Sequence, residues 1–337
     1  MRVHPVIKRL IGLVAVVLGV TMVTFIISRL IPGDPAQMLA GPRASAEAIA
    51  RIRDTLGLDQ PMLIQYGRYL ADLLRGDFGT SIVTGRSVGA DLAAVFPATI
   101  ELVLVALALS TTAGIMLGTL AAVFREGPFD YAVRLVASAS ISMPSFWLAL
   151  VMLLLFYGQF DLLPGDERIG VDFDPPPTVT GFFLVDALTT GDFRLFCDVL
   201  RHLALPAATL ALVSVGSMIR VSRTAMIEVL HQDYIRTAVA GGLSWGQVVF
   251  NHALRNALVP VVTLLGMEAA GLLFGAVIVE SVFVWPGAGS YVLNAIFTLD
   301  FPVIMGFTVI VSVAYVMINA LTDLAYRWLN PRMAEVG

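Results

Sequence analysis

The sequence predicts an all-α, polytopic membrane protein with six transmembrane helices. Of its 337 residues, 58% are hydrophobic and only 14% are charged, and the mean hydropathy is +0.85. A soluble domain is about 45–50% apolar and about 25% charged, so a soluble chain of this composition would expose too much apolar surface. The same values exclude a disordered chain and a nucleic-acid-binding protein.

The scarce reactive residues exclude several kinds of site. Cys197 is the single cysteine, so neither an intrachain disulfide nor a thiolate metal cluster is expected. Lys8 is the single lysine, and no glycine stands in the stretch before it, whereas a phosphate-binding P-loop needs Gly-x-x-x-x-Gly-Lys-Ser/Thr. The histidines are scattered without a His-x-x-x-His pair, so no metal site is expected. We therefore expect this chain neither to hydrolyse nucleotide nor to be an enzyme.

Six apolar stretches are long enough to cross a hydrocarbon core of about 30 Å, which takes roughly 20 residues. The chain divides into an N-terminus at 1–9, a first span at 10–31, an external segment at 32–97, a five-helix core at 98–328 and a tail at 329–337. The core comprises spans at 98–124, 131–158, 203–221, 259–283 and 303–328, an external loop at 159–202 and an inner loop at 222–258. A cleaved signal peptide is the alternative for the first span, but its apolar run is too long and no Ala-x-Ala site follows.

The distribution of charge predicts the orientation. With six spans both termini lie on one side, and that side holds 11 basic and six acidic residues, while the other holds ten basic and 17 acidic residues. Basic residues accumulate in cytoplasmic loops, so both termini are predicted to be cytoplasmic. Trp285 and Trp328 stand near span ends, where interfacial anchors are expected.

The external segments are patterned as amphipathic helices. Ser45 begins one that ends at Gly57, and Pro61 begins a second that ends at Gly76. Residues 182–200 look like one or two more. These pieces either cap the helix bundle or form a docking surface for a soluble partner.

The inner loop also contains a short helical pattern. Asp233 is available as its N-cap, and Gly241 and Gly242 form its stop signal. Such a helix either lies on the membrane surface or inserts its apolar face into a groove of a partner protein.

The residues from Asp233 to Leu243 and from His252 to Pro260 resemble the EAA loop of ABC importer permeases. The likeness is closest to the first permease subunit of the dipeptide, oligopeptide and nickel branch. The Glu-Ala-Ala places of the loop are taken by Arg236, Thr237 and Ala238, and its glycine by Gly242. The Ile, Leu and Pro places are taken by His252, Leu254 and Arg255. Gly241 stands where this branch usually has Lys or Arg. Further motifs of that branch recur in order at 31–35, 56–61, 76–81, 143–147 and 279–287.

This resemblance implies a type I importer permease in a bacterial inner membrane that moves di- or oligopeptides into the cytoplasm. It also implies a second homologous permease, a periplasmic binding protein and two cytoplasmic ATP-binding subunits, which would hold ATP and Mg²⁺, with no cofactor in this chain. The implied ATPase-coupling residues are Asp233, Tyr234, Arg236, Thr237, Ala238, Gly241, Gly242, Leu243, His252 and Arg255. Nickel, glutathione or another small solute is the alternative substrate, and an ion-coupled secondary transporter is the alternative class.

Other residues within the spans have two interpretations each. Glu268 lies mid-span and either lines the pore or joins helices through a hydrogen bond with Ser or Thr. Pro144 is expected to bend the third span and is a second candidate for a pore-lining residue. Glu101 and Glu280 stand nearer the outer interface, where solvated carboxylates are expected. The pairs Gly114 with Gly118 and Gly271 with Gly275 have the small-x-x-x-small spacing of close helix packing.

Overall fold

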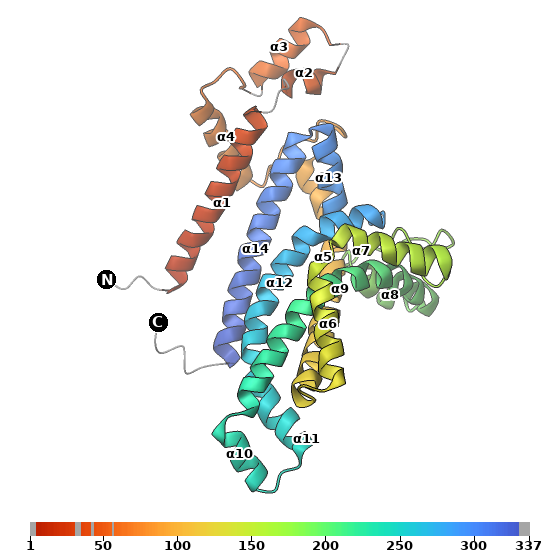
Figure 1. Ribbon diagram of the computed structural model, residues 1–337. Helices are drawn as coiled ribbons and strands as arrows, with labels where there is room; N and C mark the ends of the chain where they lie inside the picture. The colour runs from red at the N-terminus through yellow and green to blue at the C-terminus, as the bar shows by residue number, and fades with distance from the viewer. Residues whose placement is uncertain (1–4, 31–34, 42–43, 56, 330–337) are drawn as a thin grey trace. The chain divides into compact units, whose positions relative to one another are not determined.

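The computed structural model describes residues 5–30, 35–41, 44–55 and 57–329 (Figure 1). In these residues the chain is helical, apart from loops and one isolated bridge between Thr80 and Ser87. Residues 1–4 of the predicted N-terminus and 330–337 of the predicted tail lie outside the described residues. The all-α prediction is therefore confirmed for the part that is described.

The chain divides into two compact units, and the boundaries fall inside or beside helices. Unit 1 comprises Met1–Phe96 with Tyr291–Val316, and unit 2 comprises Pro97–Ser290 with Met317–Gly337. The helices of unit 1 are α1 (Pro5–Leu30), α2 (Pro35–Ala40), α3 (Ala46–Thr55), α4 (Met62–Leu74), the start of α5 (Val88–Val123), most of α13 (Ala288–Thr298) and the first half of α14 (Phe301–Leu329).

In unit 1 the amphipathic helix α4 packs on α1 through its aromatic stripe. The hydroxyl of Tyr66 donates to the carbonyl of Leu18 at 3.1 Å. The ring of Phe25 lies 5.4 Å from that of Tyr66 and 6.1 Å from that of Tyr69. A second contact ties the loop before α5 to the start of α14, because Ser81 Oγ donates to Asp300 Oδ2 at 2.6 Å. Within unit 1, α4 and the loop before α5 are thus each fixed to a long helix, α1 and α14 respectively.

In unit 2 the long helix α9 is the central element. The unit contains the rest of α5, α6 (Pro128–Ser142), α7 (Ser145–Met152), the π-helix η1 (Leu153–Gln159), α8 (Phe183–Thr190), α9 (Phe193–Leu230), α10 (Asp233–Ala240), α11 (Trp245–Gln247), the π-helix η2 (Val248–Ala253), α12 (Leu254–Val282) and the end of α14. Helices α6, α7, α8 and α12 all pack against α9. Asp192 caps the start of α9 by accepting from the backbone N–H groups of Arg194 and Leu195.

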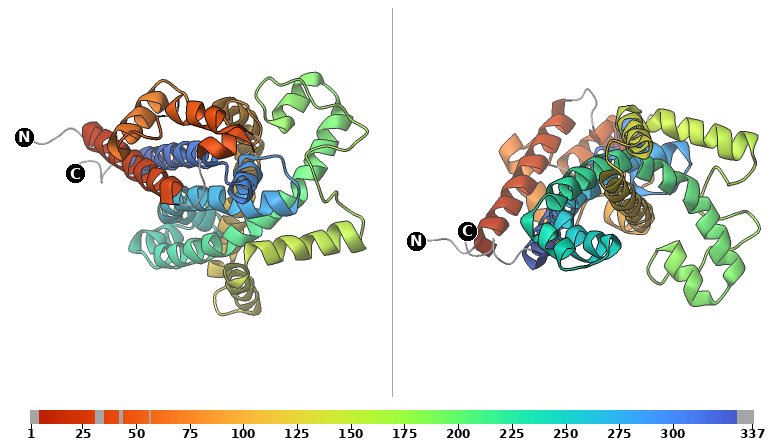
Figure 2. Two further views of the ribbon diagram at one scale, coloured as in Figure 1. Left: turned by 90° about the horizontal axis from the view of Figure 1, so that it is seen from above. Right: turned by 60° about the horizontal axis from the view of Figure 1, so that its bottom comes forward.

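The third apolar stretch, predicted as one span at 131–158, is bent by 110° between Ser142 and Ser145. Figure 2 shows α7 and η1 leaving α6 almost at a right angle. Pro144 lies at the bend with ψ near 137°, and its ring nitrogen has no N–H to continue the helical ladder. Among the described residues, five helices are long and apolar enough to cross a membrane, and the bent pair, taken as one span, would make six.

The helices extend past the predicted spans where polar residues join them. Helix α5 begins at Val88 instead of 98, with Pro97 inside it. Helix α9 runs 38 residues and merges the second half of the predicted amphipathic segment with the span at 203–221. A hydropathy window marks the apolar part of such a helix and not its polar extension.

Candidate functional site

The connection between α9 and α12 is folded as a compact helical loop. Gln232 is the N-cap of α10, so Asp233 is the first helical residue and not the cap that its residue type suggested. The carboxylate of Asp233 instead lies 3.3 Å from Nη1 of Arg236. Gly241 ends the helix, and Gly242 has φ +86°, a left-handed conformation that favours glycine.

A small apolar core holds this loop against the ends of the long helices. Ile235 is 2% exposed and packs with Met226 of α9 and with Val248 and Val249 of η2. Ala238 packs on the same cluster. Burial of these side chains on one face of α10 fixes which face remains outside.

Two polar contacts fix the rest of the loop. Asn256 Nδ2, in the first turn of α12, donates to the hydroxyl of Tyr234 at 2.7 Å. Ser244 and Gln247 form a capping box at the start of α11, in which each side chain binds the other's backbone N–H. The loop is therefore anchored both where α10 begins and where α11 begins.

The outer face of the loop combines charged and large apolar side chains. Most of the predicted coupling residues are exposed: Asp233, Tyr234, Arg236, Thr237, Gly241, Gly242, Leu243, His252 and Arg255, while Ala238 is half-buried. Three exposed apolar residues were not predicted: Val239, Trp245 and Phe250. Val239 and Trp245 stand within three residues of the glycine stop, which was the available signal, whereas no such signal marks Phe250. A face of this kind is suited to contact another protein.

The mid-span carboxylate lies between two helices. Ser214 Oγ of α9 donates to Glu268 Oε2 of α12 at 2.6 Å, and Glu268 is half-buried. This hydrogen bond belongs to the helix-joining alternative, and the pore-lining role stays a prediction. Pro144, the other pore candidate, is exposed at the bend between α6 and α7.

The two glycine pairs differ in their surroundings. A methyl group on Gly118 would lie 2.8 Å from the carbonyl oxygen of Ile219, and one on Gly114 would meet Met218, so this pair packs α5 on α9. Around Gly271 the space is open, and Gly275 has only ordinary contact with Leu210. The first pair thus packs helices within unit 2, whereas no described residue comes within 4 Å of a Cβ placed on Gly271.

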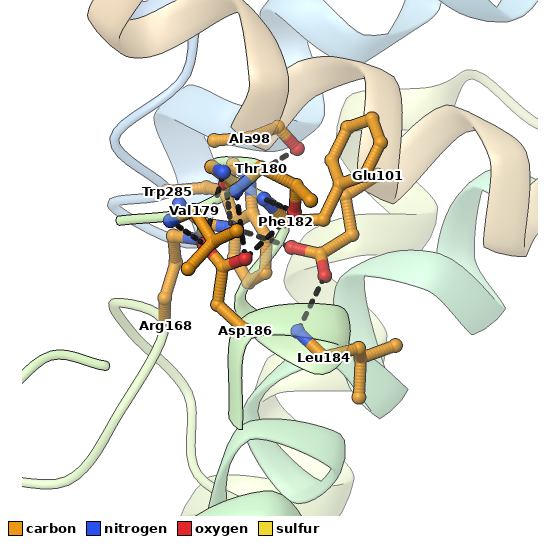
Figure 3. A network of polar contacts seen from close by, with 10 residues as sticks. Ala98, Glu101, Arg168, Val179, Thr180, Phe182, Leu184, Asp186 and Trp285 are labelled. Atoms are coloured by element: carbon orange, nitrogen blue, oxygen red, sulfur yellow. Dashed lines mark hydrogen bonds and ion pairs between the residues drawn. The ribbon is translucent and has the colours of Figure 1, made fainter. Parts of the chain in front are cut away.

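Glu101 is buried, which corrects the expectation that it is solvated. Arg168 Nη2 donates to Glu101 Oε2 at 2.5 Å, and the N–H of Leu184 donates to Oε1 at 2.7 Å (Figure 3). The guanidinium of Arg168 also lies 3.5 Å from the ring centre of Phe183. Burial lowers the pKa of Arg168, and Glu101 opposes that shift. The pair fastens the loop between η1 and α9 to α5.

Glu280 and Trp285 are also buried, for a related reason. Thr99 Oγ1 donates to Glu280 Oε1 at 2.5 Å and the N–H of Ser290 donates to Oε2 at 2.9 Å. The indole Nε1 of Trp285 donates to the carbonyl of Ala98 at 3.1 Å, so this tryptophan is a core residue and not an interfacial anchor. The side chain of Trp328 lies outside the described residues.

Sequence comparisons identify the family. Residues 114–335 match the family described as the binding-protein-dependent transport system inner membrane component. Residues 2–103 match the N-terminal region described for such membrane components. Together the two matches cover most of the chain.

Several relatives align over nearly the whole length of the chain. The probable D,D-dipeptide transport system permease DdpB of Escherichia coli (strain K12) is 52% identical over 326 residues, covering 97% of this chain and 96% of that protein. The di/tripeptide permease DppB of Pseudomonas aeruginosa (strain UCBPP-PA14) is 40% identical over 331 residues, with 97% of each chain covered. The glutathione permease GsiC of Salmonella paratyphi A (strain ATCC 9150 / SARB42) is 36% identical over 326 residues, again with 97% of each covered. This chain therefore belongs to the binding-protein-dependent transport inner membrane components, the multi-pass permeases of ABC importers.

Proposed function

We propose that this chain is one permease subunit of an ABC importer that carries dipeptides from the periplasm to the cytoplasm. The main support for dipeptides as the substrate class is the 52% identity to a probable D,D-dipeptide permease over nearly the full length of both proteins. The di/tripeptide permease at 40% identity supports the same class.

Two cytoplasmic ATP-binding subunits, holding ATP and Mg²⁺, drive this permease through the α9–α12 loop. The support is the geometry of the loop: its inner face is fixed by Ile235 and Asn256, and its outer face presents charged and apolar groups together. A helix held rigidly on one side transmits a push to α9 and α12, as a rigid-body switch between inward- and outward-facing states requires.

The remaining partners are a second homologous permease and a periplasmic binding protein in a bacterial inner membrane. Both termini and the α9–α12 loop face the cytoplasm, supported by the excess of basic residues on that side. The excess of acidic residues on the other side suits a soluble delivery protein whose docking face is basic.

Glutathione import is the second candidate. It is favoured by the 36% identity to a glutathione permease with equal coverage. Glutathione is itself a peptide, so the two candidates differ in the length and linkage of the substrate and not in its general chemistry.

Uptake measurements separate these candidates. The gene for this chain is deleted from its host strain and then restored on a plasmid. The two strains are compared for uptake of three labelled substrates: D-alanyl-D-alanine, an L,L-dipeptide and glutathione. We expect restored uptake of one or both dipeptides. Restored uptake of glutathione alone would replace the dipeptide proposal.

A matched pair of variants tests the coupling role of the loop. Gly242→Asp places a charged side chain at a left-handed position on the outer face of the loop, where nothing lies within 4 Å of the new Cβ. Gly191→Asp makes the same change at φ +72° and in equally open space at the end of α8. We expect Gly242→Asp to uncouple ATP hydrolysis from uptake or to prevent ATPase assembly, whereas Gly191→Asp keeps coupled transport. Equal coupling in both variants would refute the role.

A further inference from the structure

A basic pocket of about 120 Å³ lies between α6 and α9 in unit 2. Three arginines line it, Arg134 from α6 and Arg220 and Arg223 from α9, together with the hydroxyl residues Ser138 and Thr224. Helices α6 and α9 pack directly against each other. The volume exceeds what a single bound water needs.

The charge of the pocket is only partly compensated. Arg223 is neutralised by Asp130, to which its Nε and Nη2 donate at 2.6 and 2.7 Å. Arg134 lies over the ring of Tyr131 at 5.7 Å. Within the described ranges, neither Arg134 nor Arg220 has an ion pair or a side-chain hydrogen bond. The carboxylate of Asp130 also acts electrostatically on Arg134, and Glu126 acts on Arg223 while lying 3.3 Å from Arg125. These two acids face Arg125 and the three pocket arginines, so the pocket keeps a net positive charge.

The rim of the pocket on α6 is apolar. Tyr131, Leu135 and Ser138 share one face of α6, because they are spaced by four and then three residues. Leu135 is 71% exposed and Tyr131 is 58% exposed. Guanidinium and hydroxyl groups beside exposed apolar side chains on a membrane helix match a lipid, whose charged headgroup adjoins its acyl chains.

We propose that this pocket binds the phosphate of an anionic phospholipid, with the acyl chains lying along Tyr131 and Leu135. Arginine forks bind phosphate oxygens with two parallel hydrogen bonds, and Ser138 and Thr224 add hydroxyl donors. On α9 the pocket residues from Arg220 to Thr224 belong to the C-terminal third of the helix, which leads into the α9–α12 loop. In the orientation proposed above, this lipid belongs to the cytoplasmic leaflet. The lipid site itself does not depend on that orientation.

Lipid binding to the purified full-length chain tests this site directly. The protein in detergent is titrated with phosphatidylglycerol and with phosphatidylcholine of the same acyl chains, and bound lipid is counted by native mass spectrometry. We expect phosphatidylglycerol to bind at least tenfold more tightly than phosphatidylcholine. The double variant Arg134→Gln/Arg220→Gln should lose that preference, and Arg134→Lys/Arg220→Lys should keep most of it.

Arg194→Gln is the matched control, because it removes an exposed arginine from the opposite end of α9. Equal affinity for the two lipids, or equal loss in the control, would overturn the proposal. Full competition by inorganic phosphate would show a free-anion site without a lipid. Competition by a dipeptide would make the pocket a substrate subsite and would also overturn it. None of these measurements depends on uptake. The lipid site can therefore be refuted while the proposed transport function stands, and the transport function can be refuted while the lipid site stands.

Discussion

Arg223 and Asp130 join α9 to α6 through two hydrogen bonds, and Asp130 is fully buried. The same carboxylate accepts the backbone N–H of Glu126 at 3.0 Å, so it also fixes the turn between α5 and α6. One side chain thus ties three helices together.

Removing that carboxylate charge is expected to destabilise the protein. Asp130→Asn leaves the largely buried guanidinium of Arg223 without a counter-ion, and breaking a buried pair from one side costs about 3–5 kcal/mol. The melting temperature of the purified protein in detergent should fall by many degrees. Asp166→Asn makes the same change at an exposed position and should melt like the parent protein. Equal melting of both variants would show that the pair contributes nothing.

The two glycine pairs should respond differently to a larger side chain. Gly118→Val forces a clash with the backbone of α9, and overpacking of this kind costs about 1–3 kcal/mol. We expect less folded protein and a lower melting temperature. Gly271→Val enters open space and should leave the stability of the isolated chain unchanged. Loss of uptake in Gly271→Val without loss of stability would locate a contact with another subunit at α12.

Glu268 and Ser214 allow the pore role to be separated from the packing role. We expect Glu268→Gln to lower uptake several-fold while assembly with the ATPases stays intact, because an acid on the transport path meets the substrate. Ser214→Ala removes only the hydrogen bond between α9 and α12 and should leave uptake near normal. If both variants lose stability to a similar extent and uptake follows stability, Glu268 serves packing alone.

The buried carboxylate of Asp186 should make the external loop sensitive to acid. Burial alone would raise its pKa, but hydrogen bonds from Thr180, Gly181 and Val179 outweigh burial and hold the pKa below its ordinary value. The folded state therefore binds this proton less tightly than the unfolded chain. The stabilisation is present above an unfolded pKa of about 3.9 and is lost as the pH falls through the folded pKa.

Melting curves between pH 7 and pH 3 test this dependence. Asp186→Ala should lower the melting temperature at pH 7, and the difference from the parent protein should shrink below about pH 4. Asp172→Ala, an exposed acid in the same loop, should show no such change. A difference that stays constant over the whole range would mean that the charge of Asp186 is irrelevant.

Local patterns predicted the local structure well. The helix predicted between Pro61 and Gly76 does form as α4, and Gly241 and Gly242 do end α10. These features depend on neighbours within about four residues, which the sequence displays directly.

Contacts between distant segments were beyond reach of the sequence. Glu101 and Arg168 are 67 residues apart, and no periodicity relates them. Trp285 was expected at an interface because of its residue type, yet its indole finds the Ala98 carbonyl in the core. Pro144 predicted a bend in the third span, but the angle of 110° between α6 and α7 depends on the helices against which each of them packs.

That bend has a consequence for the surrounding bilayer. Helix α6 has 15 residues and is therefore about 22 Å long, shorter than a hydrocarbon core of about 30 Å. Helix α7, turned by 110°, adds little to that height. Hydrophobic mismatch of this size is relieved by local thinning of the membrane. Short-chain lipids should therefore gather beside α6 and favour this bent geometry, and a thicker membrane should oppose it.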